Sequence, residues 1–260
     1  MARIFITGSA DGLGQAAARR LVALGHDVVL HGRDRDRAQQ ALRAVPGART
    51  ALEGDLAGIE PTRQLAAQVN AAGPFETVIH NAGVSWGVAR RETVDGLDDV
   101  FAINALAPYL LTALITPPRR LIYLTSGLHQ SGDPDVRDLQ WRQRRWNGFQ
   151  AYANSKLFDL VLAFAVTRLW PEVLSNAVDP GWVPTKMGGP SATGDLEQGA
   201  ATQVWLAVSE EPGAKVTGRC FHDKRARAVH QAASDVKVQE AFLAACEQLT
   251  GVRLPSAVNM

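Results

Sequence analysis

Short apolar runs alternate along this chain with longer segments of helical periodicity, and no other feature restricts the possible folds as strongly. Several of the runs are almost continuously apolar, which is typical of parallel strands covered on both faces. Strands that alternate with helices at this spacing form βαβ crossovers, so we predict a doubly wound parallel α/β sheet with helices on both faces. The predicted strands are residues 3–7, 27–31, 77–80, 120–125, 174–178 and, more weakly, 219–222. The predicted helices are residues 13–24, 35–44, 61–72, 97–114 and 149–169.

Two segments interrupt this alternation, and each follows the carboxyl end of a predicted strand. Residues 127–148 are rich in Asp, Arg and Trp, and residues 180–199 are rich in Gly, Pro, Ser and Thr. Open α/β sheets bind ligands at the carboxyl ends of their strands, so we expect both segments to be substrate-side loops. The chain has no internal repeat, and its 260 residues fit one large domain. We therefore predict a single domain over residues 1–260.

Composition excludes several classes of function. Lys and Arg number 27 against 26 Asp and Glu, and a net charge of +1 gives no overall basic field for nucleic acid or anionic lipid. No apolar run approaches the roughly 18 residues that cross a bilayer, and the N-terminus is unlike a signal peptide. Cys220 and Cys246 lack zinc-site spacing and cannot staple a chain of this size. We expect a cytoplasmic protein with reduced thiols and no metal, bound to neither nucleic acid nor membrane.

Three glycines lie between the first predicted strand and the first predicted helix. Gly8 permits a sharp turn, Gly12 lets the backbone approach a pyrophosphate, and Gly14 allows close packing of helix and strand. The N-terminus of the following helix then offers free N–H groups to an anion. This placement favours a dinucleotide phosphate site, with turn glycines that hold no ligand as the alternative. The predicted loop is Thr7-Gly8-Ser9-Ala10-Asp11-Gly12-Leu13-Gly14.

Arg33 follows the second predicted strand and lies 19 residues beyond Gly14. An acidic residue at this position would accept a hydrogen bond from the ribose 2′-hydroxyl of NAD, whereas a guanidinium can bind the 2′-phosphate of NADP. Arg33 therefore favours NADP(H) over NAD(H). A solvated arginine is the alternative, and the neighbouring Asp34 could pair with Arg33 or serve NAD itself.

Tyr152 and Lys156 lie four residues apart in the predicted helix 149–169, which stacks the phenol and the ammonium on one helix face. A free phenol keeps its proton up to about pH 10. A positive charge about 4 Å away favours the ionised phenol by roughly 4 kcal/mol at an effective dielectric of about 20, and burial opposes part of this effect. The pair predicts a phenol that exchanges a proton near neutral pH, with an ordinary helix-surface pair as the alternative.

Through Thr-Gly-x-x-x-Gly-x-Gly at residues 7–14 and Tyr-x-x-x-Lys at Tyr152 and Lys156, the chain resembles the short-chain dehydrogenase/reductase family. The resemblance covers roughly residues 3–222 and implies a single Rossmann-like sheet that binds a nicotinamide dinucleotide. It assigns catalysis to Asn104, Ser126, Tyr152 and Lys156. It assigns cofactor contacts to Tyr152, Lys156, Gly8, Ser9, Asp11, Gly12, Leu13, Gly14, Arg33, Asp55, Leu56, Asn81, Ala82, Gly83, Pro180, Gly181, Val183 and Thr185.

Each of the four catalytic assignments has a chemical role. Tyr152 would donate a proton to the substrate oxygen while Ser126 hydrogen-bonds the same oxygen. Lys156 would hold the ribose hydroxyls and stabilise the ionised phenol, and Asn104 could bind a water that links Lys156 to solvent. Two alternatives stay open: Asn104 as a polar packing group, and Thr125 in place of Ser126.

A finer resemblance is to the retinol-dehydrogenase-like branch. The interval between Ser126 and Tyr152 is 26 residues, about twice the usual one, and the segments Leu128-His129 and Asp138-Leu139-Gln140-Trp141 resemble the insertion of that branch. We expect His129 to be a hydrogen bonder of this loop rather than a base. The branch implies NADP(H)-dependent reduction of aldehydes or ketones, or the reverse oxidation of alcohols. Protochlorophyllide reductases share the insertion, so reduction of a carbon–carbon double bond is an alternative, although their cysteine near the tyrosine is missing.

Five aromatic residues flank the predicted pocket in the sequence and would suit a bulky or aromatic substrate, or else cover a hydrophobic floor. These residues are Trp86, Trp141, Trp146, Phe149 and Trp182. The arginine-rich residues 142–145 are expected to form a solvated loop rather than to attract an acidic substrate. The predicted helices 97–114 and 149–169 could form a homodimer interface, and the same residues could serve a monomer.

The resulting hypothesis is an oxidoreductase that acts on a small-molecule carbonyl or alcohol. An epimerase or dehydratase of the extended family would carry a C-terminal substrate domain, for which the roughly 80 residues after Pro180 leave little room. A non-catalytic NADP-binding sensor or scaffold is a second rival. Such proteins often lack the tyrosine or the lysine, and this chain has both.

Overall fold

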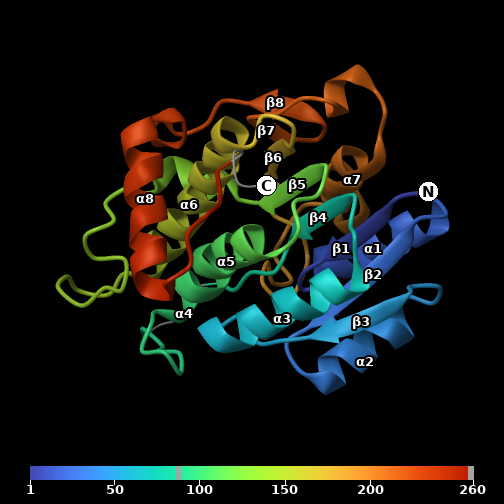
Figure 1. Ribbon diagram of the computed structural model, residues 1–260, viewed down its shortest axis with the longest axis horizontal. Coiled ribbons are helices and arrows are strands. Elements are labelled where there is room, and N and C mark those ends of the chain that lie inside the picture. Colours follow the sequence, from blue (N-terminus) through green and yellow to red (C-terminus); the bar gives the residue numbers. More distant parts are fainter. Residues whose placement is uncertain (86–88, 257–260) are drawn as a thin grey trace.

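The predicted alternation forms one sheet in the computed structural model, which describes residues 1–85 and 89–256 (Figure 1). The strands follow the order β3-β2-β1-β4-β5-β6-β7-β8; β1 to β7 pair in parallel, and β8 pairs antiparallel with β7. The prediction of a doubly wound α/β fold is confirmed, and the order reverses between β1 and β4, where such sheets bind ligands. The strands are β1 (Arg3–Ile6), β2 (Asp27–Gly32), β3 (Thr50–Glu53), β4 (Thr77–His80), β5 (Arg120–Leu124), β6 (Leu174–Val178), β7 (Arg219–His222) and β8 (Arg225–Arg227).

Helices cover both faces of the sheet (Figure 1). In β1, the fully buried Ile4 and Ile6 pack in the core formed with α1, α2 and α7, while Phe5 packs in the core formed with α3, α5, α6 and α8. Successive strand residues point to opposite faces, so two cores explain the almost continuously apolar sequence of the strands. The helices are α1 (Gly12–Ala23), α2 (Arg35–Ala44), α3 (Ile59–Ala72), α4 (Asp99–Phe101), α5 (Ala107–Leu114), α6 (Gly148–Leu169), α7 (Leu196–Val208) and α8 (Val236–Thr250).

The segment between β4 and β5 corrects one prediction. We expected a single helix over residues 97–114, and the structure instead has α4, a π-helical turn at Ala102–Leu106 and then α5. Pro108 lies at the start of α5, and proline has no N–H to donate to the carbonyl four residues earlier. That carbonyl belongs to Asn104, so the regular hydrogen-bond ladder is interrupted at the residue assigned to catalysis. Such π-helical turns often occur at functional sites.

Several elements lie outside the predicted set. Strands β3 and β8 and helices α7 and α8 were not expected, and short 3-10 turns occur at Gly127–Ser131, Pro212–Ala214 and Gln231–Ser234. The predicted loop 180–199 is also too long, because the first turn of α7 begins at Leu196. In the described part of the chain, no helix combines the length and the apolar character that a bilayer span requires.

Candidate active site

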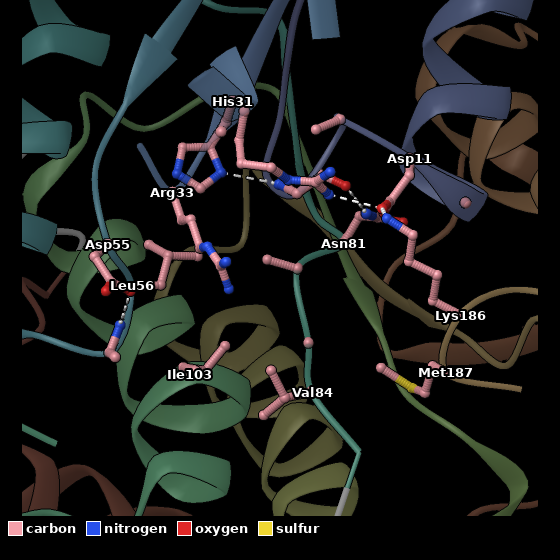
Figure 2. A pocket seen from close by; sticks show the side chains of 18 of the residues that line it. Asp11, His31, Arg33, Asp55, Leu56, Asn81, Val84, Ile103, Lys186 and Met187 are labelled. Carbon is pink, nitrogen blue, oxygen red and sulfur yellow. Dashed lines mark hydrogen bonds and ion pairs between the residues drawn. The ribbon is translucent and has the colours of Figure 1, made fainter. Parts of the chain in front are cut away.

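A cavity of about 630 Å³ lies where the carboxyl ends of β1, β2, β3 and β4 meet (Figure 2). This is the reversal point of the strand order. Eleven of the predicted cofactor residues line the cavity: Gly8, Asp11, Gly12, Leu13, Arg33, Asp55, Leu56, Asn81, Ala82, Gly83 and Thr185. Other lining residues lie outside the predicted set, among them His31, Arg37, Val84, Ile103, Lys186 and Met187.

The glycine loop has a backbone that side chains would not permit. Gly8 and Gly12 have φ values of +62° and +54°, in the left-handed region. A Cβ at Gly8 would lie 2.8 Å from the Cα of Ala82, and a Cβ at Gly14 would lie 2.4 Å from Nδ2 of Asn81. Asp11, the N-cap of α1, makes no side-chain cap, so it leaves first-turn N–H groups of α1 to an anion. These features fit the pyrophosphate of a dinucleotide.

Asn81 holds the glycine loop against the end of β4. Its Nδ2 donates hydrogen bonds to the carbonyl oxygens of Thr7 and Gly8, both at 3.0 Å. The Thr7 hydroxyl accepts in return from the backbone N–H groups of Asn81 at 2.9 Å and Ala82 at 3.0 Å. The predicted phosphate loop and the predicted Asn81-Ala82-Gly83 segment therefore form one hydrogen-bonded unit at the reversal point.

His31, at the end of β2, joins the glycine loop to the end of β3. Its Nδ1 accepts from the backbone N–H of Gly8 at 2.9 Å, which leaves Nε2 to donate to the carbonyl oxygen of Gly54 at 2.8 Å. The imidazole is only 2% exposed. Burial lowers the pKa of His31 to about 4, so the ring is neutral at physiological pH and both of its nitrogens are used.

Asp11 lies inside the glycine loop but does not present an uncompensated negative charge. Its Oδ2 lies 2.7 Å from Nη2 of Arg37 and 2.8 Å from Nζ of Lys186. Burial raises the pKa of Asp11, but the hydrogen bonds and charges of Lys186 and Arg37 outweigh burial and hold this pKa below its usual range. Arg37 and Lys186, from segments distant in the sequence, therefore lie beside the glycine loop. The ion pair of Lys186 with Asp11 joins the segment after β6 to this loop (Figure 2).

Arg33 reaches into the cavity from the end of β2 (Figure 2). Its Nε lies 3.3 Å from Oδ2 of Asp34, whose other oxygen accepts from the backbone N–H of Arg37 at 2.8 Å and caps α2. Of the two alternatives for Asp34, the pairing with Arg33 is present. The capping hydrogen bond holds the pKa of Asp34 below its usual range, and Asp34 does not line the cavity.

Part of the lining away from the glycine loop is apolar, and Arg91, Glu92 and Asp99 add charged groups beside it. Leu56 is buried after β3, and Val84 and Ile103 face the cavity from the other side (Figure 2). Oδ1 of Asp55 accepts from the backbone N–H of Ala57 at 3.0 Å and fixes the turn that presents Leu56. An apolar slot with polar groups at its edge suits a flat heterocyclic ring.

Helix α6 carries the phenol and the ammonium. The Tyr152 hydroxyl donates to Sδ of Met187 at 3.8 Å, and Met187 lines the cavity. Nζ of Lys156 lies 5.8 Å from the centroid of the Tyr152 ring. It donates to the carbonyl oxygen of Leu124 at 2.8 Å and to Oδ2 of Asp159 at 2.9 Å. The pair is thus together as predicted, whereas the carboxylate beside Lys156 was not expected; contact of Lys156 with ribose stays a prediction.

Asn104 lies in the π-helical turn and is 1% exposed. Its Nδ2 donates to the carbonyl oxygen of Val84 and to the hydroxyl of Ser155, both at 3.0 Å, and its Oδ1 accepts from the backbone N–H of Val84 at 2.8 Å. Asn104 therefore joins the segment after β4 to α6 one residue before Lys156. These contacts agree with the packing alternative, and the water relay stays a prediction.

Ser126 follows β5 and starts a 3-10 turn, where its hydroxyl accepts from the backbone N–H of Leu128 at 3.3 Å. Thr125 is 3% exposed and donates its hydroxyl to the carbonyl oxygen of Lys156 at 2.7 Å. This inward hydrogen bond disfavours the Thr125 alternative. Nδ1 of His129 lies 2.6 Å from the carbonyl oxygen of Ser126, as expected of a loop hydrogen bonder, and burial lowers the pKa of His129.

Seven predicted cofactor residues do not line the cavity: Ser9, Gly14, Tyr152, Lys156, Pro180, Gly181 and Val183. Ser9 is fully buried and donates its hydroxyl to the carbonyl oxygen of Ile6 at 3.1 Å, so its side chain serves the core. Gly14 allows close packing against the side chain of Asn81, which a Cβ at this position would prevent. Their contacts with a cofactor stay predictions, as do those of the segment after β6.

The insertion between Ser126 and Tyr152 is held by its own aromatic and charged residues. The rings of Trp141 and Trp146 meet edge to face at 5.5 Å, and the Arg144 guanidinium lies 4.0 Å above the Trp141 ring. Arg144 also pairs with Asp133 at 3.1 Å, so it is a structural residue of this loop. Trp182 is 57% exposed in the segment after β6. Trp86 lies outside the described residues.

A doubly wound sheet with a glycine-rich turn after its first strand defines the class of dinucleotide-binding α/β proteins. The family model described as short chain dehydrogenase matches residues 2–122. The chain is also 41% identical to the short-chain dehydrogenase chry4 of Gibberella zeae, over 98% of this chain and 100% of the relative. The chain therefore belongs to the short-chain dehydrogenase family, in its retinol-dehydrogenase-like branch, and its family binds a nicotinamide cofactor.

Other relatives and solved structures agree. Retinol dehydrogenase 13 of Homo sapiens is 28% identical over 97% of this chain and 86% of the relative. Polyprenol dehydrogenase of Mus musculus is 31% identical over 95% of this chain and 83% of the relative. A crystal structure of an uncharacterized protein from Mycobacterium paratuberculosis has a TM-score of 0.82 at 28% identity, covering 98% of this chain and 95% of that one. A blue fluorescent protein from a metagenomic library, in complex with NADPH, has a TM-score of 0.69 at 25% identity, covering 85% and 95%.

Proposed function

We propose that this oxidoreductase transfers a hydride between NADP(H) and the carbonyl or alcohol group of a bulky or aromatic small molecule. The observation that carries the proposal is that two features meet at one cavity. The Tyr152 hydroxyl contacts Met187, and Met187 lines the same cavity as the glycine loop. Negative charge develops on a carbonyl oxygen as its carbon is reduced, so a proton donor beside a dinucleotide cavity matches this reaction.

The side chains of the chain would handle the proton and the substrate oxygen. In reduction, Tyr152 donates its hydroxyl proton to that oxygen, and Ser126 donates a hydrogen bond to it. The Lys156 ammonium stabilises the phenolate left behind. In oxidation, the phenolate accepts the proton of the alcohol. The bound nicotinamide supplies or accepts the hydride.

Two arginines support the preference for NADP(H). Arg33 and Arg37 both line the cavity at the end of β2, and a 2′-phosphate beside them would gain charge-assisted hydrogen bonds. Asp34, the carboxylate that would serve NAD, is occupied by Arg33 and by the cap of α2. The NADPH complex of the related fluorescent protein adds support.

Apolar side chains of the segment after β6 support a bulky substrate. Met187 is 44% exposed beside the Tyr152 hydroxyl, and Trp182 is held by a hydrogen bond from its Nε1 to the carbonyl oxygen of Gly188 at 3.0 Å. Exposed apolar side chains next to a reactive group favour apolar ligands. Two relatives are named for retinol and polyprenol, which are bulky apolar alcohols.

The test is an assay of NADPH and NADH oxidation with aldehydes and ketones of graded size, and of the reverse reaction with the alcohols. We expect cofactor consumption equal to product, faster with NADPH and with bulky substrates. Tyr152→Phe should lower kcat by about 100-fold or more while NADPH binding, measured by fluorescence, stays within about twofold. Full activity in Tyr152→Phe would exclude Tyr152 as the acid. Equal rates with NADH would overturn the cofactor preference.

Product analysis in the same assay separates the rival reactions. Saturation of a carbon–carbon double bond would identify the alternative reductase, and product without net cofactor consumption would identify an epimerase or dehydratase. Tight NADPH binding without turnover of any substrate would favour a sensor or scaffold.

A further inference from the structure

Asp159 is a buried carboxylate with no part in the proton transfer described above. It lies three residues after Lys156 on α6, and its Oδ2 is 2.9 Å from Nζ of Lys156. The side chains are 3% and 6% exposed, respectively. Removing an ionised carboxylate from water is unfavourable unless a close partner compensates for it. Lys156 is that partner, which couples the buried carboxylate directly to the candidate active site.

The Lys156 ammonium has three N–H donors, and two of them make hydrogen bonds within the protein. One N–H goes to the carbonyl oxygen of Leu124 at the end of β5, and one goes to Asp159. These two bonds fix Nζ at the carboxyl edge of the sheet, 5.8 Å from the centroid of the Tyr152 ring. Within the described part of the chain Nζ makes these two hydrogen bonds, so its third N–H can serve a ligand or the phenol.

We propose that Asp159 is a positioning residue that holds the Lys156 ammonium beside Tyr152 and keeps it protonated in its buried site. The consequence for turnover rests on the proposed function, because it assumes that the phenol of Tyr152 exchanges the proton. The consequence for the charge of Lys156 does not depend on any substrate.

Electrostatics supports this role. Burial lowers the pKa of Lys156, but the charge of Asp159, together with Tyr152 and the hydrogen bond to Asp159, outweighs burial and raises this pKa. Burial raises the pKa of Asp159 to about 6 against the opposing charge of Lys156. The pair is therefore ionised above about pH 6.

Few other groups act on this pair. From α6 itself the phenol of Tyr152 faces it, and from β5 the phenol of Tyr123 interacts with Asp159, with the pKa of Tyr123 raised by burial. The π-helical turn packed against α6 contributes the uncharged amide of Asn104. In the part of the chain that the structure describes, Asp159 is thus the carboxylate paired with Lys156.

The substitution Asp159→Asn removes the charge of this side chain while nearly keeping its shape. The amide has nearly the same size and can still accept a hydrogen bond from Nζ, but it carries no charge. Burial then dominates at Lys156, as it does for buried lysines without a partner, and the ammonium loses its proton at lower pH. A neutral amine cannot stabilise the Tyr152 phenolate.

The first arm of the test is an NMR titration of protein labelled with 13C at lysine Cε. The chain has five lysines, Lys156, Lys186, Lys215, Lys224 and Lys237, so the Lys156 signal can be assigned from its loss in Lys156→Met. We expect Lys156 to titrate above the ordinary value of a lysine, about 10.4, in the wild type, and at least one pH unit lower in Asp159→Asn than in the wild type. Asp159→Glu, which keeps the charge, should restore the high midpoint. An unchanged midpoint in Asp159→Asn overturns the proposal. If that variant does not fold, a wild-type Lys156 that titrates below the ordinary lysine value of about 10.4 overturns it.

Asp98→Asn is the matched control. Asp98 is 1% exposed and burial raises its pKa to about 6, as for Asp159, but its carboxylate accepts from the backbone N–H of Phe101, and it has no ion pair with a lysine among the described residues. Its replacement should leave the Lys156 midpoint unchanged. A shift of the same size in Asp98→Asn would show a general effect of buried charge and overturn the specific role of Asp159.

The second arm is the pH profile of alcohol oxidation. Asp159→Asn should lose the alkaline part of the kcat profile at least one pH unit earlier than the wild type, with the substrate KM changed by less than about threefold. A profile that superimposes on the wild type overturns the positioning role. If the wild type turns over no substrate, the proposed function fails, and the NMR arm still decides the role of Asp159.

Discussion

At the scale of single residues, charged side chains around the cavity pair across segments that are distant in the sequence. Asp11 of the glycine loop holds Arg37 of α2 and Lys186 of the segment after β6. A carboxylate next to a phosphate site would normally weaken binding, but here it gathers two cations at the rim. A bound anion would therefore meet positive charge from Arg33, Arg37 and Lys186.

Replacing Arg33 tests the cofactor preference. Arg33→Ala should weaken NADPH binding by about tenfold or more, since a charge-assisted hydrogen bond to phosphate contributes roughly 1.5–3 kcal/mol, and should change NADH binding by less than about threefold. Isothermal titration with both cofactors measures this difference. Arg43→Ala is the control, because Arg43 lies at the end of α2 and does not line the cavity. Equal losses for NADPH and NADH in Arg33→Ala would contradict the phosphate role.

His31 makes the stability of the fold sensitive to acid. The pKa of His31 is about 4 in the folded chain, whereas an unfolded histidine titrates near 6.5. Between these pH values the unfolded chain binds a proton that the folded chain does not, so the free energy of unfolding falls as the pH falls. We expect a loss of about 2–3 kcal/mol from this residue between pH 7 and pH 4.5.

Urea unfolding at the two pH values measures this loss, and His31→Gln should reduce it. His80→Gln provides the control, because burial lowers the pKa of His80 to about 3 but His80 contacts Thr112 rather than the glycine loop. Both variants should reduce the acid sensitivity of stability. Only His31→Gln should reduce the acid sensitivity of NADPH binding, since only His31 accepts from Gly8. The same change in both variants would exclude the link to the loop.

At the scale of secondary structure, a strand is readily predicted from the sequence when both of its faces are buried, because burial leaves a short apolar run. The six predicted strands match β1, β2, β4, β5, β6 and β7, most of whose residues are buried. β3 was missed because it is a short edge strand whose residues are half-buried or exposed. β8 consists of three exposed residues, Arg225, Ala226 and Arg227, so it leaves no apolar pattern in the sequence.

The residues of the candidate site also include some that the sequence predicts and some that it does not. Glycines and polar residues at the ends of strands were predictable, because the fold brings these ends to one edge. The side-chain pairs of Asp11 and Asp159 were not, since they join residues whose contacts depend on the packing of helices and loops. The sequence contains one sign of the π-helical turn: Pro108 lies four residues after Asn104 and cannot donate an N–H to its carbonyl oxygen. That spacing alone does not distinguish a π-helical turn from a kink.

The N-cap of α6 gives a prediction about a whole helix. Oδ1 of Asn147 accepts from the backbone N–H of Gln150 at 3.1 Å, and Tyr152 lies in the next turn. Asn147→Ala should lower the free energy of unfolding by about 1 kcal/mol and should also lower kcat several-fold, because the first turns of α6 loosen. Asp235→Ala removes the equivalent cap of α8 and should lower stability similarly without changing kcat. Thermal unfolding and steady-state rates measure both effects, and equal loss of kcat in the two variants would contradict the local effect.

At the scale of the whole molecule, the C-terminal part of the chain packs against α5 and α6, the helices at which a dimer interface was possible from the sequence. α8 packs on α6, and 15 of the 22 residues of α6 are buried. Two hydrogen bonds also hold the segment after α8 against the rest of the molecule. Tyr109 donates its hydroxyl to the carbonyl oxygen of Val252 at 2.6 Å, and Nε1 of Trp170 donates to the carbonyl oxygen of Pro255 at 2.7 Å. A dimer through α5 and α6 would have to displace these contacts. The prediction of one domain over residues 1–260 agrees with this long-range packing and stays a prediction.

Phe242 links α8 to the rest of the molecule and gives the test of this arrangement. Its fully buried ring stacks on Phe158 of α6 at 4.7 Å. Phe242→Ala should lower the free energy of unfolding by about 3–5 kcal/mol through the cavity it leaves. Val236→Ala, at an exposed position of the same helix, should change it by less than about 0.5 kcal/mol. Because α8 covers α6 in the wild type, self-association through this face, measured by light scattering, should rise in Phe242→Ala, where α8 is loosened, relative to the wild type and to Val236→Ala. A wild-type dimer that forms with α8 still protected from hydrogen exchange would show that the subunits meet through another face.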